Sequence, residues 1–166
     1  MAVAEIIGAA IGTMLLIIVA YLLVGNVLST AEVVSNAQKD MTLLEATRLN
    51  TDIRITNVSI AGSTINFTVN NTGNDIIRDF LHAEVFVHAP GDTTGFQDYN
   101  YNAIDPGPPG TWTKSIIDDS LHVHPGELGP EESMFVNVYF IGATPPTGSD
   151  VIFCTNNGVY ASAHVI

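Results

Sequence analysis

The chain has 166 residues, of which 46% are hydrophobic, and its mean hydropathy is +0.29. It carries 5 Lys and Arg against 17 Asp and Glu, a formal net charge of −12. This apolar content excludes an intrinsically disordered chain. The carboxylates repel phosphate, so we expect no nucleic-acid partner. Cys154 is the only cysteine, which excludes a disulfide within the chain.

The first predicted element is an apolar helix. No charged side chain occurs between Glu5 and Glu32, and the centre of this stretch, residues 6–28, reads IIGAAIGTMLLIIVAYLLVGNVL. About 20 helical residues cross the hydrocarbon layer of a membrane, so the run is long enough to span it. The alternatives are a buried core helix, for which the run is too long and too uniform, and a cleaved signal peptide. The first basic residue, Lys39, comes too late for the basic region of a signal peptide.

We expect the same helix to continue to about residue 49. Residues 31–53 contain neither proline nor glycine, and their apolar residues recur at steps of three and four, as on one face of a helix. A helix over 6–49 is about 65 Å long at about 1.5 Å per residue. Its first half is apolar all round and its second half amphipathic. It therefore needs apolar partners along its length, either lipid or copies of itself.

Gly8 and Gly12 form a GxxxG motif, in which small residues one turn apart let two helices approach closely. The alternative is that these glycines face lipid. We predict a helix–helix assembly surface made of Glu5, Gly8, Gly12, Leu15, Leu16, Val19, Leu22, Leu23, Val33, Ala37, Met41 and Leu44.

From residue 52 the hydrophobic period changes to two, which predicts β-strands. The alternating runs are 53–60, 65–69, 82–88, 111–116, 134–141 and 150–155, and a further strand follows the tight-turn sequence Asn156-Asn157-Gly158. Long loops rich in Gly and Pro are expected at 89–112, 124–133 and 142–150. The fold class is α+β: a hydrophobic helix (1–50) followed by an immunoglobulin-like or Greek-key antiparallel β-sandwich (51–166).

Candidate metal sites are weak. His122 and His124 would share one face of a strand, with Glu127, His82 or His88 as further ligands, but a zinc site normally shows paired ligand clusters. We therefore expect no metal here.

Cys154 with His164 suggests blue copper, which needs two histidines, a cysteine and a weak axial ligand. No methionine follows Cys154, so a buried structural thiol is the better interpretation. The adjacent carboxylates at 118–119 and 131–132 point apart on a strand, and no nucleotide-binding or hydrolase motif occurs. We expect no cofactor and no enzymatic activity.

Three Asn-x-Ser/Thr sequons lie in or beside the first predicted hairpin. They begin at Asn57, Asn66 and Asn70 and are candidate N-glycosylation sites on an exported face. The alternative is ordinary polar alternation in strands rich in Thr and Asn.

The order of elements resembles the archaellin and archaeal type IV pilin superfamily, including archaellum accessory proteins of the FlaF/FlaG type. The stretches that carry the resemblance are IIGAAIGTMLLIIVAYLLVG, LSTAEVVSNAQKDM, INFTVNNTGNDII, PGELGPEES and TNNGVYASAHVI. They cover nearly the whole chain, and no single motif among them is diagnostic. Secreted members of the superfamily carry a basic leader before the apolar run, whereas this sequence has no basic residue before Lys39. We expect either that the sequence is the mature form or that the protein is not processed, and the second case favours the accessory proteins.

The resemblance implies a structural subunit of an archaellum or pilus-like surface filament, used for motility or adhesion. Such a subunit is membrane-inserted before assembly, is then extracellular, and has copies of itself and the archaellum machinery as partners. In that superfamily a glutamate near the mature N-terminus pairs with a neighbour's amine, a role that would fall to Glu5. The alternative is a membrane-anchored accessory protein whose sandwich binds the surface layer as part of the stator.

Overall fold

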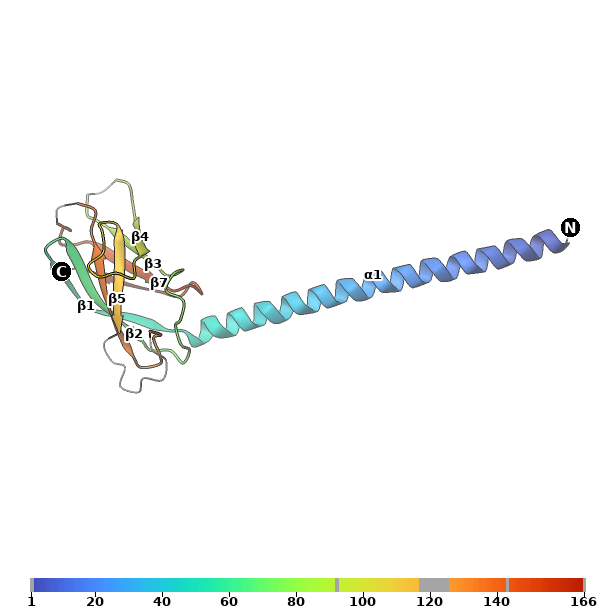
Figure 1. Ribbon diagram of the computed structural model, residues 1–166, viewed down its shortest axis with the longest axis horizontal. Helices are drawn as coiled ribbons and strands as arrows, with labels where there is room; N and C mark the ends of the chain where they lie inside the picture. Colours follow the sequence, from blue (N-terminus) through green and yellow to red (C-terminus); the bar gives the residue numbers. More distant parts are fainter. Residues whose placement is uncertain (1, 92, 117–125, 143, 166) are drawn as a thin grey trace. The chain divides into compact units, whose positions relative to one another are not determined.

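The computed structural model describes residues 2–91, 93–116, 126–142 and 144–165 (Figure 1). The chain divides into two compact units, Met1–Leu44 and Glu45–Ile166. The first unit is helical, and the second holds the last turns of the same helix together with all the strands. We call the second unit the head.

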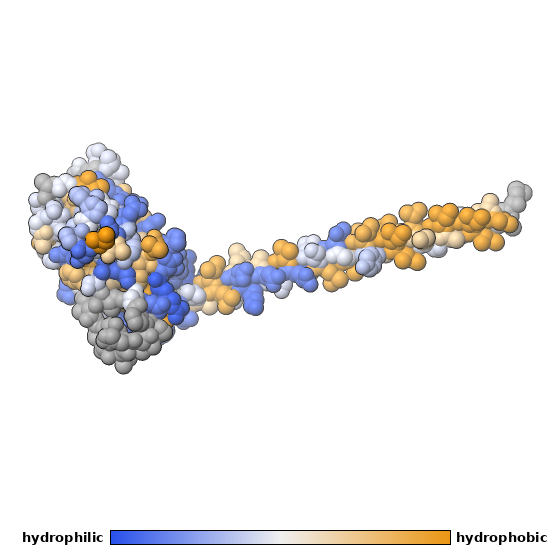
Figure 2. Space-filling model, in the orientation of Figure 1, coloured by the Kyte–Doolittle hydropathy of each residue, from blue (hydrophilic) through white to orange (hydrophobic). Residues whose placement is uncertain are grey.

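The predicted helix is confirmed as one element, α1 (Ala2–Asn50), of 49 residues and about 73 Å. Its large apolar side chains are exposed from one end to the other; Leu16, for example, is 71% exposed and Met41 73%. Figure 2 shows the change of composition along it, from an almost continuous apolar surface to mixed polar and apolar side chains. Within the described chain, α1 alone is long and apolar enough to cross a membrane.

Eight strands form one sheet in the order β1-β2-β6-β5-β4-β3-β7-β8. All neighbouring pairs are antiparallel except β4 and β5, which are parallel. The strands are β1 (Ile53–Ala61), β2 (Thr64–Asn71), β3 (Glu84–His88), β4 (Gln97–Tyr101), β5 (Thr111–Ile116), β6 (Ser133–Tyr139), β7 (Asp150–Cys154) and β8 (Tyr160–His164).

Two sequence expectations about these strands are wrong. Strand β4 lies inside the stretch 89–112 that was expected to be a loop. The hydrophobic pattern does not reveal this polar strand, because only Tyr99 of its residues is fully buried. The third strand begins at Glu84 rather than at residue 82. His82 stays in a turn, since both its amide and its Nδ1 bond to the carboxylate of Asp79.

The sheet curls into a sandwich around an apolar core. The largest fully buried side chains include Trp112 of β5 and Phe153 of β7, whose rings meet edge to face with centroids 5.6 Å apart. These strands are separated by two others in the sheet, so the contact shows that the sheet curls over on itself. Aromatic pairs of this kind add about 0.5–1.5 kcal/mol to the burial of their area.

The end of α1 is closed by a loop of the head. The last carbonyls of a helix lack partners within it. Here the carbonyl of Asn50 accepts hydrogen bonds from the amides of Asn74 (2.8 Å) and Asp75 (3.2 Å). The carbonyl of Asp52 accepts two more from Thr72 (2.9 Å) and Gly73 (3.0 Å). The loop 71–75 therefore completes the backbone bonding where the helix gives way to β1.

Gly73 is required by this close approach. A Cβ atom at Gly73 would lie 2.4 Å from both the carbonyl oxygen of Asn50 and the amide nitrogen of Asp52. We expect Gly73→Ala to destabilise the head by about 1–3 kcal/mol, the usual cost of overpacking. Thermal unfolding of the full chain in detergent, followed by the circular dichroism of the strands, measures this. The exposed neighbour variant Asn74→Ala should unfold like the original chain; equal effects of the two variants would contradict the explanation.

Candidate functional site

The candidate site is the exposed surface of α1, and the predicted assembly residues fall on two lines along it. Each line is followed by alternating steps of three and four residues, which keep to one side of a helix. The first, which we call the glycine line, is Glu5, Gly8, Gly12, Leu15, Val19, Leu22, Asn26, Ser29, Val33, Asn36 and Asp40. The second, which we call the long seam, is Ile6, Ala9, Thr13, Leu16, Ala20, Leu23, Val27, Thr30, Val34, Ala37, Met41 and Leu44.

The glycine line is apolar only in the first half of the helix. Gly8 and Gly12 lie in open space, because a Cβ atom added at either glycine would have no atom beyond the local helix within 4 Å. Glu5 lies in the first turn, where a carboxylate is favoured by the helix dipole. From Asn26 onward the line becomes mostly polar. The glycine line is therefore suited to contacts only along the apolar half.

The long seam stays free of charge from Ile6 to Leu44. Its two polar members satisfy their hydroxyl groups inside the helix: Thr13 Oγ1 donates to the carbonyls of Ala9 (3.1 Å) and Ala10 (2.9 Å), and Thr30 Oγ1 donates to that of Asn26 (2.8 Å). A hydroxyl bonded in this way needs no other partner when the surface is covered. The seam thus offers an apolar surface over both halves of the helix.

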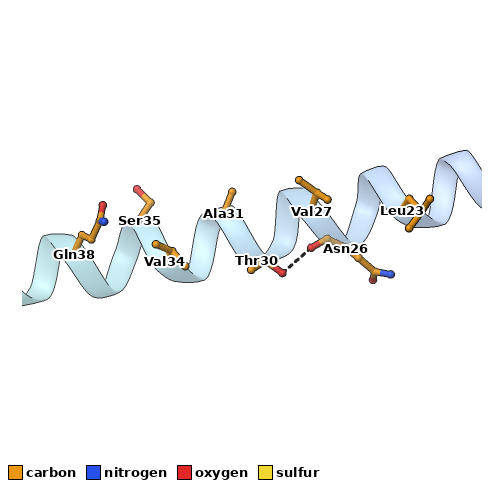
Figure 3. A pocket seen from close by; sticks show the side chains of 8 residues that line it. All are labelled: Leu23, Asn26, Val27, Thr30, Ala31, Val34, Ser35 and Gln38. Carbon is orange, nitrogen blue, oxygen red and sulfur yellow. Dashed lines mark hydrogen bonds between the residues drawn. The ribbon is translucent and has the colours of Figure 1, made fainter.

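A shallow hollow of about 550 Å³ runs along the middle of this surface (Figure 3). Four seam residues, Leu23, Val27, Thr30 and Val34, contribute to its lining. The small side chain of Ala31 also lines the hollow. Val27, Thr30 and Val34 were not among the assembly residues predicted from the sequence, although extending the three-and-four spacing back from Ala37 would have found them. The hollow is open and lacks charged groups, so it is suited to packing rather than to catalysis.

The three sequons occupy different environments. Asn57 is exposed at a bulge of β1 between Thr56 and Ser59, with a φ of 53°. Asn70 is held on β2: its Nδ2 donates to Thr56 Oγ1 (3.3 Å), and its Oδ1 accepts from Ser133 Oγ (2.9 Å). The Oδ1 atom of Asn66 is buried. Only Asn57 presents its side chain openly to solvent.

The candidate metal ligands that lie within the described residues are not grouped together. His122 and His124 lie outside the described residues. Glu127 pairs with Arg78 at 3.2 Å, and His82 bonds to Asp79, which holds the pKa of that carboxyl below its usual value. His88 is the last residue of strand β3. Among the described residues no three His, Cys, Asp or Glu side chains are grouped to hold a metal ion.

Cys154 and His164 lie far apart on their hairpin. The strand partner of Cys154 is Tyr160, whereas that of His164 is Asp150, four residues along β7. At about 3.3 Å per residue this is a separation of about 13 Å, too far for a shared copper ion. His164 Nδ1 instead lies 2.9 Å from the carboxylate of Asp150.

Cys154 is half-buried beside charged groups of the head. Burial raises the pKa of its thiol, and the carboxylate of Glu84, its strand partner on β3, raises it further. Arg48, in the last turn of α1, acts in the opposite direction and lowers it. A thiol with a raised pKa is a poor nucleophile near neutral pH. This environment supports the interpretation of Cys154 as a structural thiol.

Comparison with solved structures shows where this fold occurs. The archaellum periplasmic stator protein FlaG from Sulfolobus acidocaldarius is similar at TM-score 0.51 and 20% identity, over 68% of this chain and 97% of that one. A chain of the FlaF and FlaG stator complex from the same organism gives TM-score 0.50 and 18% identity, over 67% and 85%. The archaeal flagellin FlaB1 from Methanocaldococcus jannaschii gives TM-score 0.48 and 16% identity, over 68% and 88%.

No family model matches the chain, and no curated protein matches it either. The resemblance in fold to archaellum proteins of the FlaF/FlaG type, expected from the sequence, is therefore confirmed by the arrangement of elements and not by residue identity.

The reactivity of Cys154 tests the electrostatics around it. We expect Glu84→Gln to lower the pKa of the thiol and Arg48→Gln to raise it, because each change removes one of the two opposing charges. The measurement is the rate of alkylation by iodoacetamide as a function of pH in the folded chain. Asp98→Asn, an exposed change on β4, is the control and should leave the profile in place. Shifts in the same direction for both variants would refute this account.

Proposed function

We propose that this chain is a non-enzymatic structural component of an archaellum-type surface machine, anchored in the membrane by the first half of α1. The observation that carries the proposal is the long, uniformly apolar and exposed helix attached to a folded β head. Residues 6–28 rise about 34 Å, which matches the hydrocarbon layer of about 30 Å. The similarity of the head to two archaellum stator chains supports the archaellum assignment.

Within that role we propose a static anchor on the stator side, whose head binds the surface layer. The support comes from the second half of α1. In the core of a filament a helix is covered by several neighbours and needs apolar side chains on several faces. Beyond residue 28, however, α1 carries charged side chains outside its seam: Asp40 flanks the seam, and Glu32 and Lys39 lie on the opposite side of the helix. That narrow surface suits one helical neighbour.

A filament subunit is the second candidate, and the glycine line favours it. Gly8 and Gly12 would let neighbouring helices approach closely in a packed core, and Glu5 would pair there with a neighbour's terminal amine. Copies of this chain would then be its main partners, and its final location would be an extracellular filament.

Mechanical shearing of cells separates the two candidates. We expect the chain to remain with the membranes when surface filaments are sheared off and to resist extraction by alkaline carbonate. Replacing Leu16 and Ile17 by Arg costs about 6 kcal/mol of insertion free energy and should release the chain from the membrane fraction. The control is Ser35→Arg, which lies beyond the apolar run. Recovery of the chain as a main protein of the sheared filaments would favour the second candidate, and extraction by carbonate would contradict both.

We further propose that Asn57 is the glycosylated sequon. Its exposure leaves room for a glycan, whereas modification of Asn70 would break its bond to Thr56, and modification of Asn66 would have to open a half-buried site. Mass spectrometry of glycopeptides from the native protein should find the glycan on Asn57, and Asn57→Gln should remove it. A glycan found on Asn70 while Asn57 is bare would contradict this assignment.

A further inference from the structure

The part of the long seam beyond the apolar run has a strict heptad spacing. We call it the stalk seam: Val27, Thr30, Val34, Ala37, Met41 and Leu44. Val34 is 49% exposed, Met41 73% and Leu44 69%, so nothing in the chain itself covers it. A repeat of 3.5 residues, sustained over these steps, is the pattern of a helix that supercoils with another helix. The pattern therefore specifies the kind of partner as a helix.

We propose that the stalk seam pairs with the same seam of a second copy, parallel and in register. This inference rests on the proposed membrane anchor. Two copies inserted through the same apolar run have the same direction and the same depth, so Val34 and Met41 of one copy lie level with those of the other. The seam also continues without interruption into the apolar run, through Leu23 and Leu16, so the pairing extends through the anchor.

The composition of the stalk seam suits a two-stranded pair. Val27, Val34 and Met41 occupy one of the two seam positions, and Thr30, Ala37 and Leu44 occupy the other. β-Branched residues at the first position with leucine at the second favour two strands in parallel coiled coils; Val27 and Val34 meet the first condition, and Leu44 meets the second. The hollow in Figure 3, lined by Val27, Ala31 and Val34, offers space for a side chain of the facing helix. Thr30 can be covered because its hydroxyl already donates to Asn26.

The charges beside the seam permit two copies to meet. In a parallel pair the flanking residues of one helix face those five positions later on the other. Val33 would face Gln38, an uncharged pair, and only Asp40 would face a like charge, Glu45. Glu32 and Lys39 lie on the far side of the helix from the seam. Along the stalk seam, repulsion between the two helices is therefore confined to one exposed, salt-screened pair of positions.

Disulfide crosslinking in native-like membranes tests the pairing. In the full chain, with Cys154 replaced by Ser, single changes Ala37→Cys and Leu44→Cys place thiols on the seam. Asn36→Cys and Lys39→Cys place them away from it and serve as matched controls. Mild oxidation should join the seam variants into dimers at least about tenfold faster than the controls. Only a parallel pair in register brings both Ala37 and Leu44 next to their own counterparts in the other copy, since an antiparallel pair can do so for one position alone.

The other outcomes overturn the inference in distinguishable ways. Equal crosslinking of seam and control variants would indicate random encounters in the membrane. Because each variant carries one cysteine, a crosslinked product of a mass other than twice that of the chain would indicate a disulfide to a different protein. Monomers that still resist carbonate extraction would contradict the pairing alone, whereas chains released by carbonate would contradict the proposed anchor as well.

A charge variant provides a second measurement that needs no cysteine. Asp40→Lys replaces the single repulsive pair with an attraction to Glu45 of the other copy, so the dimer fraction in detergent should rise at low salt. The gain should disappear at about 1 M salt, because exposed charges are then screened. Lys39→Asp, on the far side, is the control and should leave the dimer fraction unchanged. A dimer fraction that does not respond to Asp40→Lys would also overturn the pairing.

Discussion

The exposed apolar surface of α1 is the constraint on which the rest of this protein depends. Burying a single large aliphatic side chain is worth about 1.5–3 kcal/mol, and the first half of the helix exposes more than a dozen of them. Tens of kcal/mol therefore oppose leaving this helix in water. Lipid, neighbouring helices, or both must cover it before the chain reaches its working state, and every functional proposal follows from the choice among these.

The head differs from α1 in that its apolar side chains and several of its charges are paired within it. Its core is closed without help from the first unit, and the described residues use two of its few cations internally. Arg78 pairs with Glu127, and Lys114 donates to the carbonyl of Gly126 while its ammonium lies 4.0 Å from the ring centroid of Phe80. The surface is left with an excess of carboxylates. Such a surface repels other acidic heads at low salt and favours partners or conditions that supply cations.

The sequence predicts the elements of this fold better than their pairing. The helix and most strands follow from hydrophobic period alone, and Asn156-Asn157-Gly158 correctly marks the hairpin between β7 and β8. Strand β4 is missed because its side chains are polar or aromatic, and its parallel pairing with β5 depends on contacts distant in the sequence. The availability of Asn57 over Asn70 likewise depends on Thr56 and Ser133, which no sequon pattern includes.

The candidate surface on the helix could be found almost entirely from sequence, since a helix places its side chains by count. The separation of the glycine line from the long seam is harder to see in the sequence. Apart from Glu5 and Thr13, both are apolar up to Leu23, and they diverge only at Asn26 and Val27. That Thr30 fits an apolar surface could be found only in the structure. From the sequence alone its hydroxyl is expected to need an outside partner, but the hydroxyl donates to the carbonyl of Asn26 within the helix.

The junction at Asn50 has a mechanical consequence. The helix enters β1 after only two residues, so tension applied along α1 would reach the strands without a long linker to absorb it. The hydrogen bonds from the loop 71–75 to Asn50 and Asp52 carry that load first, and the ladder between β1 and β2 carries it next. A pull on the helix would therefore load a short row of backbone hydrogen bonds before it reached the apolar core.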